Sequence, residues 1–208
     1  MSKGSLVPIA APEGARQHIG DVIMDLVLRV PDSSESELEQ PNARAHAIAR
    51  TTSRQASLLA GSLALPPGFL GWLTILPELV GVWKLQAQMV SDIAALYGKT
   101  PKLGREQMIY CLFKHVSAQL FRDVVVRVGE RYVVRRVSLA FIQALARTVG
   151  VTITQRMIGK GVSRFVPLLG AVGVSAYAYF DTSQVAKTAI ELFSSEITLD
   201  ADEISAEI

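Results

Sequence analysis

The stretch ASLLAGSLALPPGFLGWLTILPELVGV, residues 56–82, decides the fold because it carries a single charge, on Glu78. Pro66, Pro67 and Pro77 interrupt it. A helix that spans a membrane needs about 20 uninterrupted apolar residues, and the run before Pro66 has roughly half of that. The stretch therefore predicts two short apolar helices around a Pro-Pro-Gly corner. Either they are buried in a protein core or they insert into one leaflet of a membrane.

The composition lies between that of a soluble protein and that of a membrane protein. Half of the 208 residues are hydrophobic and 19% are charged, which is fewer charges than the roughly 25% of an ordinary soluble domain. This length suits one domain with a sizeable core. Cys111 is the single cysteine, which excludes an internal disulfide. The N-terminal residues show no signal-peptide pattern, so we expect a cytoplasmic location, at the cytosolic face of a membrane.

Charge is distributed unevenly along the chain. The net charge is −4 over residues 1–40, +3 over 41–101, +9 over 102–164 and −6 over 165–208, in agreement with the overall +2. A basic middle between acidic ends can attract anionic lipid or nucleic acid. Its own acidic ends can equally neutralise it.

The chain divides into four parts. Apolar residues at helical spacing predict an amphipathic helix within residues 1–30, which ends at Pro31. The acidic segment 31–41 predicts a flexible linker. A helical domain over 42–196 and an acidic, frayed tail over 197–208 complete the chain.

The helical domain begins with a predicted helix from Asn42, as N-cap, to Pro66. The next helix is expected to begin near Pro77, because a first helical position needs no N–H. Glu78 would then lie in its first turn and favour the helix dipole. Gly98 has the place of a C-cap glycine after Tyr97.

Later residues also show helical spacing, with one ambiguous region. A helix is predicted over 105–128. The runs VVVRV and RYVVRRV around Gly129 have the composition of a β-hairpin, but we prefer a helix because Arg127, Arg131 and Arg135 recur every four residues. Further helices are expected over 138–149, 151–164, 168–180 and 182–196, the last one capped by Asp181 or Thr182.

A second uncharged stretch, FVPLLGAVGVSAYAYF, covers residues 165–180. Ala171 and Ser175 show the same small-xxx-small spacing as Ser57 and Gly61, which allows helix backbones to approach closely. We expect the two stretches to pack against each other. The predicted fold class is all-α, a compact multi-helix bundle built around two apolar helical stretches interrupted by Pro and Gly.

Three segments together resemble the bacterial EcsC-like family: LPPGFLGWLTILPELVGVWKLQAQMVSDIAALYGKTP, REQMIYCLF and VPLLGAVGVSAYAYFDTSQVAKTAIELF. The shared features are an acidic residue at the head of a long helix (Glu78), a Tyr-Gly end (Tyr97-Gly98) and a late Pro-Leu-Leu-Gly-Ala segment from Pro167. The resemblance covers residues 43–196. It implies an all-helical, membrane-associated bacterial protein without an assigned activity, and it carries over no catalytic residue.

No motif predicts an enzyme. Cys111 and His115 are four residues apart, but two ligands are too few for a closed zinc site, and a catalytic pair needs a third, orienting group. The run TQRMIGKGV fails as a phosphate-binding loop, because Thr154 and Gly161 stand where Gly and Ser/Thr are required. We therefore expect no catalytic residues, no metal and no cofactor.

Two sets of residues are candidate contact sites. The apolar set would touch a membrane or a protein partner, and comprises Phe69, Leu70, Trp72, Leu73, Ile75 and Leu76. The basic set would touch anionic headgroups, and comprises Arg127, Arg131, Arg135, Arg136, Arg156, Lys160 and Arg164. Alternatively, the basic set is a solvated helix face or pairs with the acidic C-terminus. Nucleic acid is disfavoured because Tyr132 is the only interleaved aromatic residue.

Glu78 has two interpretations. A carboxylate among apolar residues at membrane depth is functional or paired, whereas at a helix start it is a capping acid. The sequence as a whole predicts a non-enzymatic, membrane-associated helical protein that binds anionic lipids. The alternative is a soluble helical adaptor, whose apolar stretches are its core and which binds a protein partner.

Overall fold

The computed structural model describes residues 29–63, 71–159 and 167–199. The α-helices there are α2 (Asn42–Leu63), α3 (Gly71–Leu96), α4 (Arg105–Phe113), α5 (Leu139–Gly159) and α6 (Pro167–Phe193), with a short 3-10 helix, η1 (Thr100–Lys102). The strands are β1 (Val125–Val128), β2 (Arg131–Val134) and β3 (Glu196–Leu199). A mostly helical fold is therefore confirmed, but the all-α prediction is wrong because of the three-stranded sheet.

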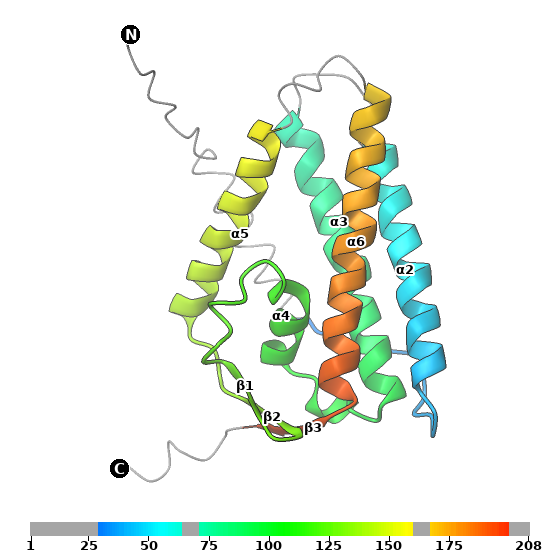
Figure 1. The fold of residues 1–208 in the computed structure, drawn as a ribbon, viewed down its shortest axis with the longest axis vertical. Helices are drawn as coiled ribbons and strands as arrows, with labels where there is room; N and C mark the ends of the chain where they lie inside the picture. Colours follow the sequence, from blue (N-terminus) through cyan, green and yellow to red (C-terminus); the bar gives the residue numbers. More distant parts are fainter. Residues whose placement is uncertain (1–28, 64–70, 160–166, 200–208) are drawn as a thin grey trace.

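Helices α2, α3 and α6 lie side by side, and the sheet lies at one end of them (Figure 1). Small residues bring α2 and α6 close together: a Cβ atom at Gly61 would overlap with Ser175 Oγ. Ser53 Oγ and Ser183 Oγ are 3.2 Å apart further along the same pair of helices. The expected packing of the two apolar stretches through small residues is thus present between α2 and α6.

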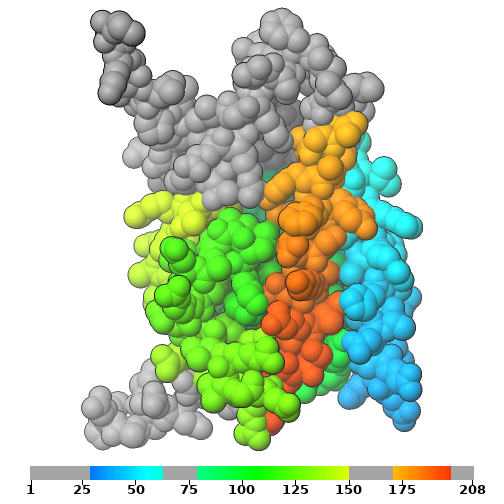
Figure 2. Space-filling model, viewed as in Figure 1, coloured from blue at the N-terminus to red at the C-terminus, as the bar shows by residue number. Residues whose placement is uncertain are grey.

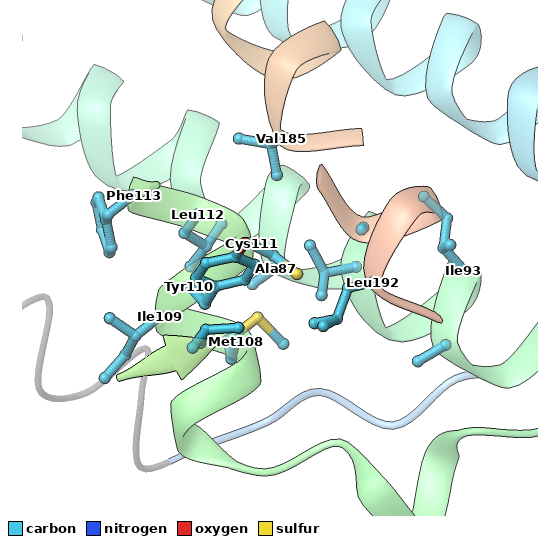
Figure 3. Packing of buried hydrophobic residues seen from close by; sticks show 14 of the residues in the cluster. Ala87, Ile93, Met108, Ile109, Tyr110, Cys111, Leu112, Phe113, Val185 and Leu192 are labelled. Atoms are coloured by element: carbon cyan, nitrogen blue, oxygen red, sulfur yellow. The ribbon is translucent and has the colours of Figure 1, made fainter. Parts of the chain in front are cut away.

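Helix α4 fills the centre of the main core. Its residues from Met108 to Phe113 are all buried, and Figure 3 shows them between side chains of α3 and α6 such as Ala87, Val185 and Leu192. The rings of Phe113 and Trp83 are 5.3 Å apart in an edge-to-face arrangement, a favourable geometry for two aromatic side chains. Among the residues whose side chains the structure describes, large apolar side chains therefore gather around α4.

The sheet corrects the predicted helix over 105–128 and its continuation through Arg135. Helix α4 ends at Phe113, and β1 and β2 form an antiparallel hairpin. Gly129 in the turn has a φ of 63°, a conformation that glycine adopts without a steric penalty. The valine-rich strands of this hairpin follow the β-propensity of branched residues. β3 then pairs with β2 in parallel, so residues 197–199 of the predicted tail belong to the sheet.

Three helices are longer than predicted. α3 begins at Gly71 rather than at Pro77, so Pro77 lies inside the helix, where it leaves one backbone hydrogen bond unmade. The helices predicted over 138–149 and 151–164 are the single helix α5, and those over 168–180 and 182–196 are the single helix α6. Gly98 follows α3 with a φ of 64°, as expected for a C-cap glycine.

The acidic segment 31–41 is not a free linker in the structure. Ser33 Oγ donates a hydrogen bond of 2.7 Å to Asp92 in α3, and Leu38 N donates one of 3.1 Å to Leu96 O at the end of α3. Arg44 Nη2 in α2 and Glu35 Oε1 form an ion pair with a distance of 2.6 Å. These contacts hold the segment along α3. The amphipathic helix predicted within residues 1–30 lies outside the described residues, except for residues 29 and 30, which have no helical structure.

None of the helices among the described residues is both long and apolar enough to span a membrane.

Candidate functional site

The two ends of the molecule differ in chemistry. Figure 1 shows that four helix ends lie together at the end opposite the sheet: the end of α2 at Leu63, the start of α3 at Gly71, the end of α5 at Gly159 and the start of α6 at Pro167. We call this the apolar end, because the sequence between Leu63 and Gly71 and the sequence of α6 from Pro167 to Phe180 carry no charge. The opposite end holds the sheet, and we call it the sheet end.

The predicted apolar contact residues belong to the apolar end as far as the structure describes them. Trp72, Leu73, Ile75 and Leu76 lie in the first two turns of α3. Phe69 and Leu70 lie outside the described residues. Glu78 is the eighth residue of α3, and the first turn of α3 has no acidic residue, so the prediction that Glu78 caps the helix is wrong. The helix already includes the residues from Gly71 to Leu76, so Pro77 and Glu78 lie in its interior.

One face of α6 near the apolar end exposes large uncharged side chains. Val172 is 61% exposed and Phe180 is 63% exposed, with Tyr177 and Tyr179 about 40% exposed between them. In Figure 2 α6 runs across the visible surface between α2 and the hairpin region, so it faces solvent there. Ala171 and Ala178 on its other side are buried. The exposed face of α6 is therefore an extension of the apolar end along the side of the molecule.

The predicted basic stripe is divided between the two ends. Arg127 and Arg131 lie on the hairpin, Arg135 and Arg136 directly follow β2, and all four are at the sheet end (Figure 1). Arg156 lies in the last turn of α5, at the apolar end. Lys160 and Arg164 lie outside the described residues. One surface cannot contain all seven residues.

Even within the hairpin the spacing of four residues does not line one face. Arg127 pairs with Tyr132 across the two strands, so these side chains share a face, and the Arg127 guanidinium lies 5.8 Å from the centre of the Tyr132 ring. Arg131 precedes Tyr132 and points to the other face, because successive strand residues alternate. There it forms a 2.9 Å ion pair with Glu196 of β3.

A buried polar cluster joins α3, α6 and the loop after α4. Asp181 in α6 accepts hydrogen bonds from His115 Nε2 at 2.8 Å and Tyr177 Oη at 2.6 Å on its Oδ1 atom, and from Gln86 Nε2 at 2.9 Å on its Oδ2 atom. Gln86 Nε2 also donates to Thr182 Oγ1 at 3.1 Å. We call these five residues the Asp181 cluster. It cross-links three segments that are distant in the sequence.

The electrostatics of the Asp181 cluster favour an ionised carboxylate. Burial by itself raises the pKa of the Asp181 carboxyl, but the hydrogen bonds from His115, Tyr177 and Gln86 and the attraction to His115 outweigh it and hold that pKa below its ordinary value. Since a carboxylate only accepts hydrogen bonds, Nε2 of His115 carries a proton. Among the described residues, His115 Nδ1 and Gln86 Oε1 are buried without a hydrogen-bond partner.

The sequence prediction missed this cluster. Asp181 and Thr182 were assigned to a helix start, but α6 is continuous there, so they are interior positions. Two signals were present: Gln86 interrupts the apolar face of α3 between Trp83 and Val90, and Asp181 interrupts the apolar face of α6 between Ala178 and Val185. Polar residues within an apolar face are the sequence mark of a buried network.

A second polar group ties the sheet to the helices. Tyr132 Oη donates a 2.8 Å hydrogen bond to Glu191 in α6, and Lys114 Nζ lies 3.6 Å from the same carboxylate. Burial and the hydrogen bond to Glu191 raise the pKa of Tyr132 to about 12. Lys114 Nζ also lies 5.0 Å from the centre of the Tyr110 ring. These contacts stabilise the sheet end.

Cys111 and His115 do not form a pair suited to catalysis. Cys111 is completely buried, and burial raises the pKa of its thiol, which disfavours the reactive thiolate. His115 uses Nε2 for Asp181 instead. In the part of the chain that the structure describes, no three His, Cys, Asp or Glu side chains are placed to hold a metal ion.

Comparisons of the chain with models of protein families, with curated proteins and with solved structures give no match. Family membership therefore stays a prediction.

Proposed function

We propose that the protein is a non-enzymatic, membrane-associated helical protein that contacts the cytosolic face of a membrane with its apolar end. The observation that supports this proposal is the position of four helix ends, at Leu63, Gly71, Gly159 and Pro167, at the end of the molecule opposite the sheet. The uncharged sequence 64–70 joins the first two of these ends. The two apolar stretches thus belong to the same end of one helical bundle.

The exposed face of α6 suits a shallow, tilted insertion of the apolar end. Val172, about 8 Å from the start of α6 at 1.5 Å per residue, would reach the upper acyl chains, whereas Tyr177 and Tyr179, further along α6, would lie at the headgroup level, where tyrosine is enriched. The basic residues that precede α6 would reach the headgroups with their long side chains.

Headgroup contact in this orientation comes from three of the seven predicted basic residues. Arg156 lies in the last turn of α5 at the apolar end, and Lys160 and Arg164 belong to the sequence that joins α5 to α6. Each basic group near an anionic leaflet contributes about 1 kcal/mol. Arg127, Arg131, Arg135 and Arg136 are at the sheet end and would face away from the membrane.

The test is co-sedimentation of the full chain with phosphatidylcholine vesicles, with and without phosphatidylglycerol, at low and high salt. Val172→Glu should abolish the binding that survives high salt. Val128→Glu is the matched control, because Val128 is 60% exposed and lies on β1 at the sheet end. Equal losses for both variants, or none for Val172→Glu, would refute insertion by the apolar end.

The electrostatic part has its own matched pair of variants. Reversing Arg156, Lys160 and Arg164 to Glu should weaken binding to phosphatidylglycerol vesicles at low salt. Reversing Arg127, Arg131 and Arg136 to Glu makes the same charge change at the sheet end and should leave binding unchanged. A larger loss in the second variant would contradict the proposed orientation.

The second candidate is a soluble helical adaptor, and one observation favours it. Parts of both apolar stretches pack against each other in a small core cluster of Ala56, Ala60, Val82 and Ala178. In this alternative the apolar end is covered by a protein partner. A protein that sediments with no vesicle at any salt concentration would support the adaptor over the membrane protein.

A further inference from the structure

The sheet end carries basic residues that the proposed membrane contact does not use. Arg135 and Arg136 are exposed and directly follow β2. Arg105 Nη2 donates a 3.1 Å hydrogen bond to Val137 O, and Lys102 Nζ donates one of 3.2 Å to Ile197 O in β3. Arg105 Nη2 also lies 3.3 Å from Glu106 Oε1. We call these four basic residues the sheet-edge cations.

The register of the sheet brings the acidic C-terminal sequence to the same place. β3 is parallel to β2, with Leu199 paired with Val134. Leu199, the last residue before the acidic sequence, therefore lies beside Val134, the residue before Arg135. The sequence DADEISAEI from residue 200 to 208 holds four acidic residues and no basic one.

One contact of this kind already exists within the sheet. Glu196 at the start of β3 forms its 2.9 Å ion pair with Arg131 of β2. The acidic sequence 200–208 therefore follows directly after β3, in which Glu196 already pairs with Arg131 of β2. Nine residues can reach about 30 Å when extended, which is enough to pass Arg135, Arg136 and Arg105 from Leu199.

We propose that the sheet-edge cations are a docking surface for the chain's own acidic C-terminal segment, residues 200–208. The segment is opposite in charge to the surface, is tethered beside it by β3, and shields it from other anions. Tethering gives the segment a high effective concentration at the surface, so a free anion must compete with it. This inference is independent of the proposed membrane contact, which concerns the other end of the molecule.

The experiment compares two full-length chains in binding a fluorescent peptide of sequence DADEISAEI, followed by anisotropy at low salt. One chain is the natural protein and the other carries Asp200→Asn, Asp202→Asn, Glu203→Gln and Glu207→Gln. The second chain should bind the peptide at least about tenfold more tightly, because its surface is no longer shielded, and salt should remove the difference.

Charge reversal locates the surface. Adding Arg135→Glu and Arg136→Glu to the neutralised chain should remove its gain in peptide affinity. Adding Arg50→Glu and Arg54→Glu, which makes the same charge change on exposed residues of α2, should keep the gain. Circular dichroism checks that each variant is folded.

Three results would overturn the proposal. The natural and neutralised chains could bind the peptide equally, or neither could bind it. The gain could also persist in the Arg135→Glu, Arg136→Glu variant. A gain seen with phosphatidylglycerol vesicles but not with the peptide would assign the surface to lipid headgroups instead.

Discussion

The apolar end and the sheet end use apolar residues in different ways. In the main core, toward the sheet end, large side chains such as Phe113, Phe121 and Phe193 are almost completely buried. Toward the apolar end the buried residues of the second core cluster, such as Ala56 and Ala60, are smaller, with Leu59 and Leu85 partly buried against them, while large side chains on α6 face solvent. The large apolar side chains that the structure describes are therefore buried in the main core and exposed on this part of α6.

The largest expected difference concerns one buried and one exposed phenylalanine. Phe113→Ala should destabilise the protein by about 3–5 kcal/mol, because it opens a cavity in the main core. Phe180→Ala, at a side chain that is 63% exposed, should change the free energy of unfolding by less than about 0.5 kcal/mol. Urea denaturation measures both. Similar losses would mean that Phe180 belongs to a core and would weaken the contrast between the main core and the exposed face of α6.

A second pair tests the close packing of α2 and α6. Gly61→Val should destabilise the protein by about 1–3 kcal/mol, because the new side chain would overlap with Ser175. Gly173→Val makes the same change at a position with no atom within 4 Å of the added Cβ. It should leave the thermal midpoint nearly unchanged. If Gly61→Val were as harmless, the helices would be further apart than described.

The Asp181 cluster lies between the two ends and predicts a dependence on pH. The folded-state pKa of Asp181 lies below its ordinary value of 3.8, so its contribution to stability is present above that pH and is lost as the pH falls through the folded-state value. Asp181→Asn should cost about 1–3 kcal/mol at neutral pH, because it removes the charged acceptor of three donors. The difference between the variant and the natural protein should shrink on acidification.

Asp123→Asn is the control for this experiment, because Asp123 is exposed in the loop before β1. Its unfolding free energy, measured across the same pH range, should follow that of the natural protein. An Asp181→Asn difference that stays constant from neutral to acidic pH would contradict the account of the cluster.

The smallest expected effect concerns the link between the sheet and α6. Tyr132→Phe should cost about 1 kcal/mol, because it removes one hydrogen bond, to Glu191. The folded-state pKa of Tyr132, about 12, is above its ordinary value of 10.0, so its stabilisation is present below pH 10.0 and is lost as the pH rises through about 12. Ultraviolet titration of tyrosine in Glu191→Gln should show a lower pKa for Tyr132. If the Tyr132 pKa in Glu191→Gln equalled that in the natural protein, the hydrogen bond between Tyr132 and Glu191 would be excluded.

Much of the helical fold could be predicted from the sequence, because the spacing of apolar residues is a local signal. Helix α2 and the Gly98 end of α3 were expected at nearly their observed positions. The start of α3 was not, because Pro77 suggests a helix start in isolation, whereas the long helix accommodates it. The predicted break of α6 at Asp181 was also wrong. Asp181 can cap a helix, but here it lies inside α6 and accepts hydrogen bonds in the core.

The sheet and the candidate sites could be predicted less well. The hairpin was recognised and rejected, because its arginines fit a helical spacing as well as a strand composition. β3 was missed because its pairing with Tyr132 and Val133 joins residues that are more than sixty positions apart. The division of the basic residues between two ends follows from the position of that sheet, which no local pattern reveals.

The two tryptophans provide the most direct test of the central claim, that the apolar end contacts the membrane. Trp72 is the second residue of α3, at the apolar end, whereas Trp83 lies about 16 Å further along the helix axis and packs against Phe113 in the core. Quenching by brominated acyl chains would be measured on Trp83→Phe, which keeps Trp72, and on Trp72→Phe, which keeps Trp83. We predict that vesicles quench Trp72 and leave Trp83 unchanged. Equal quenching of the two tryptophans, or quenching of Trp83 alone, would contradict the claim that the apolar end contacts the membrane.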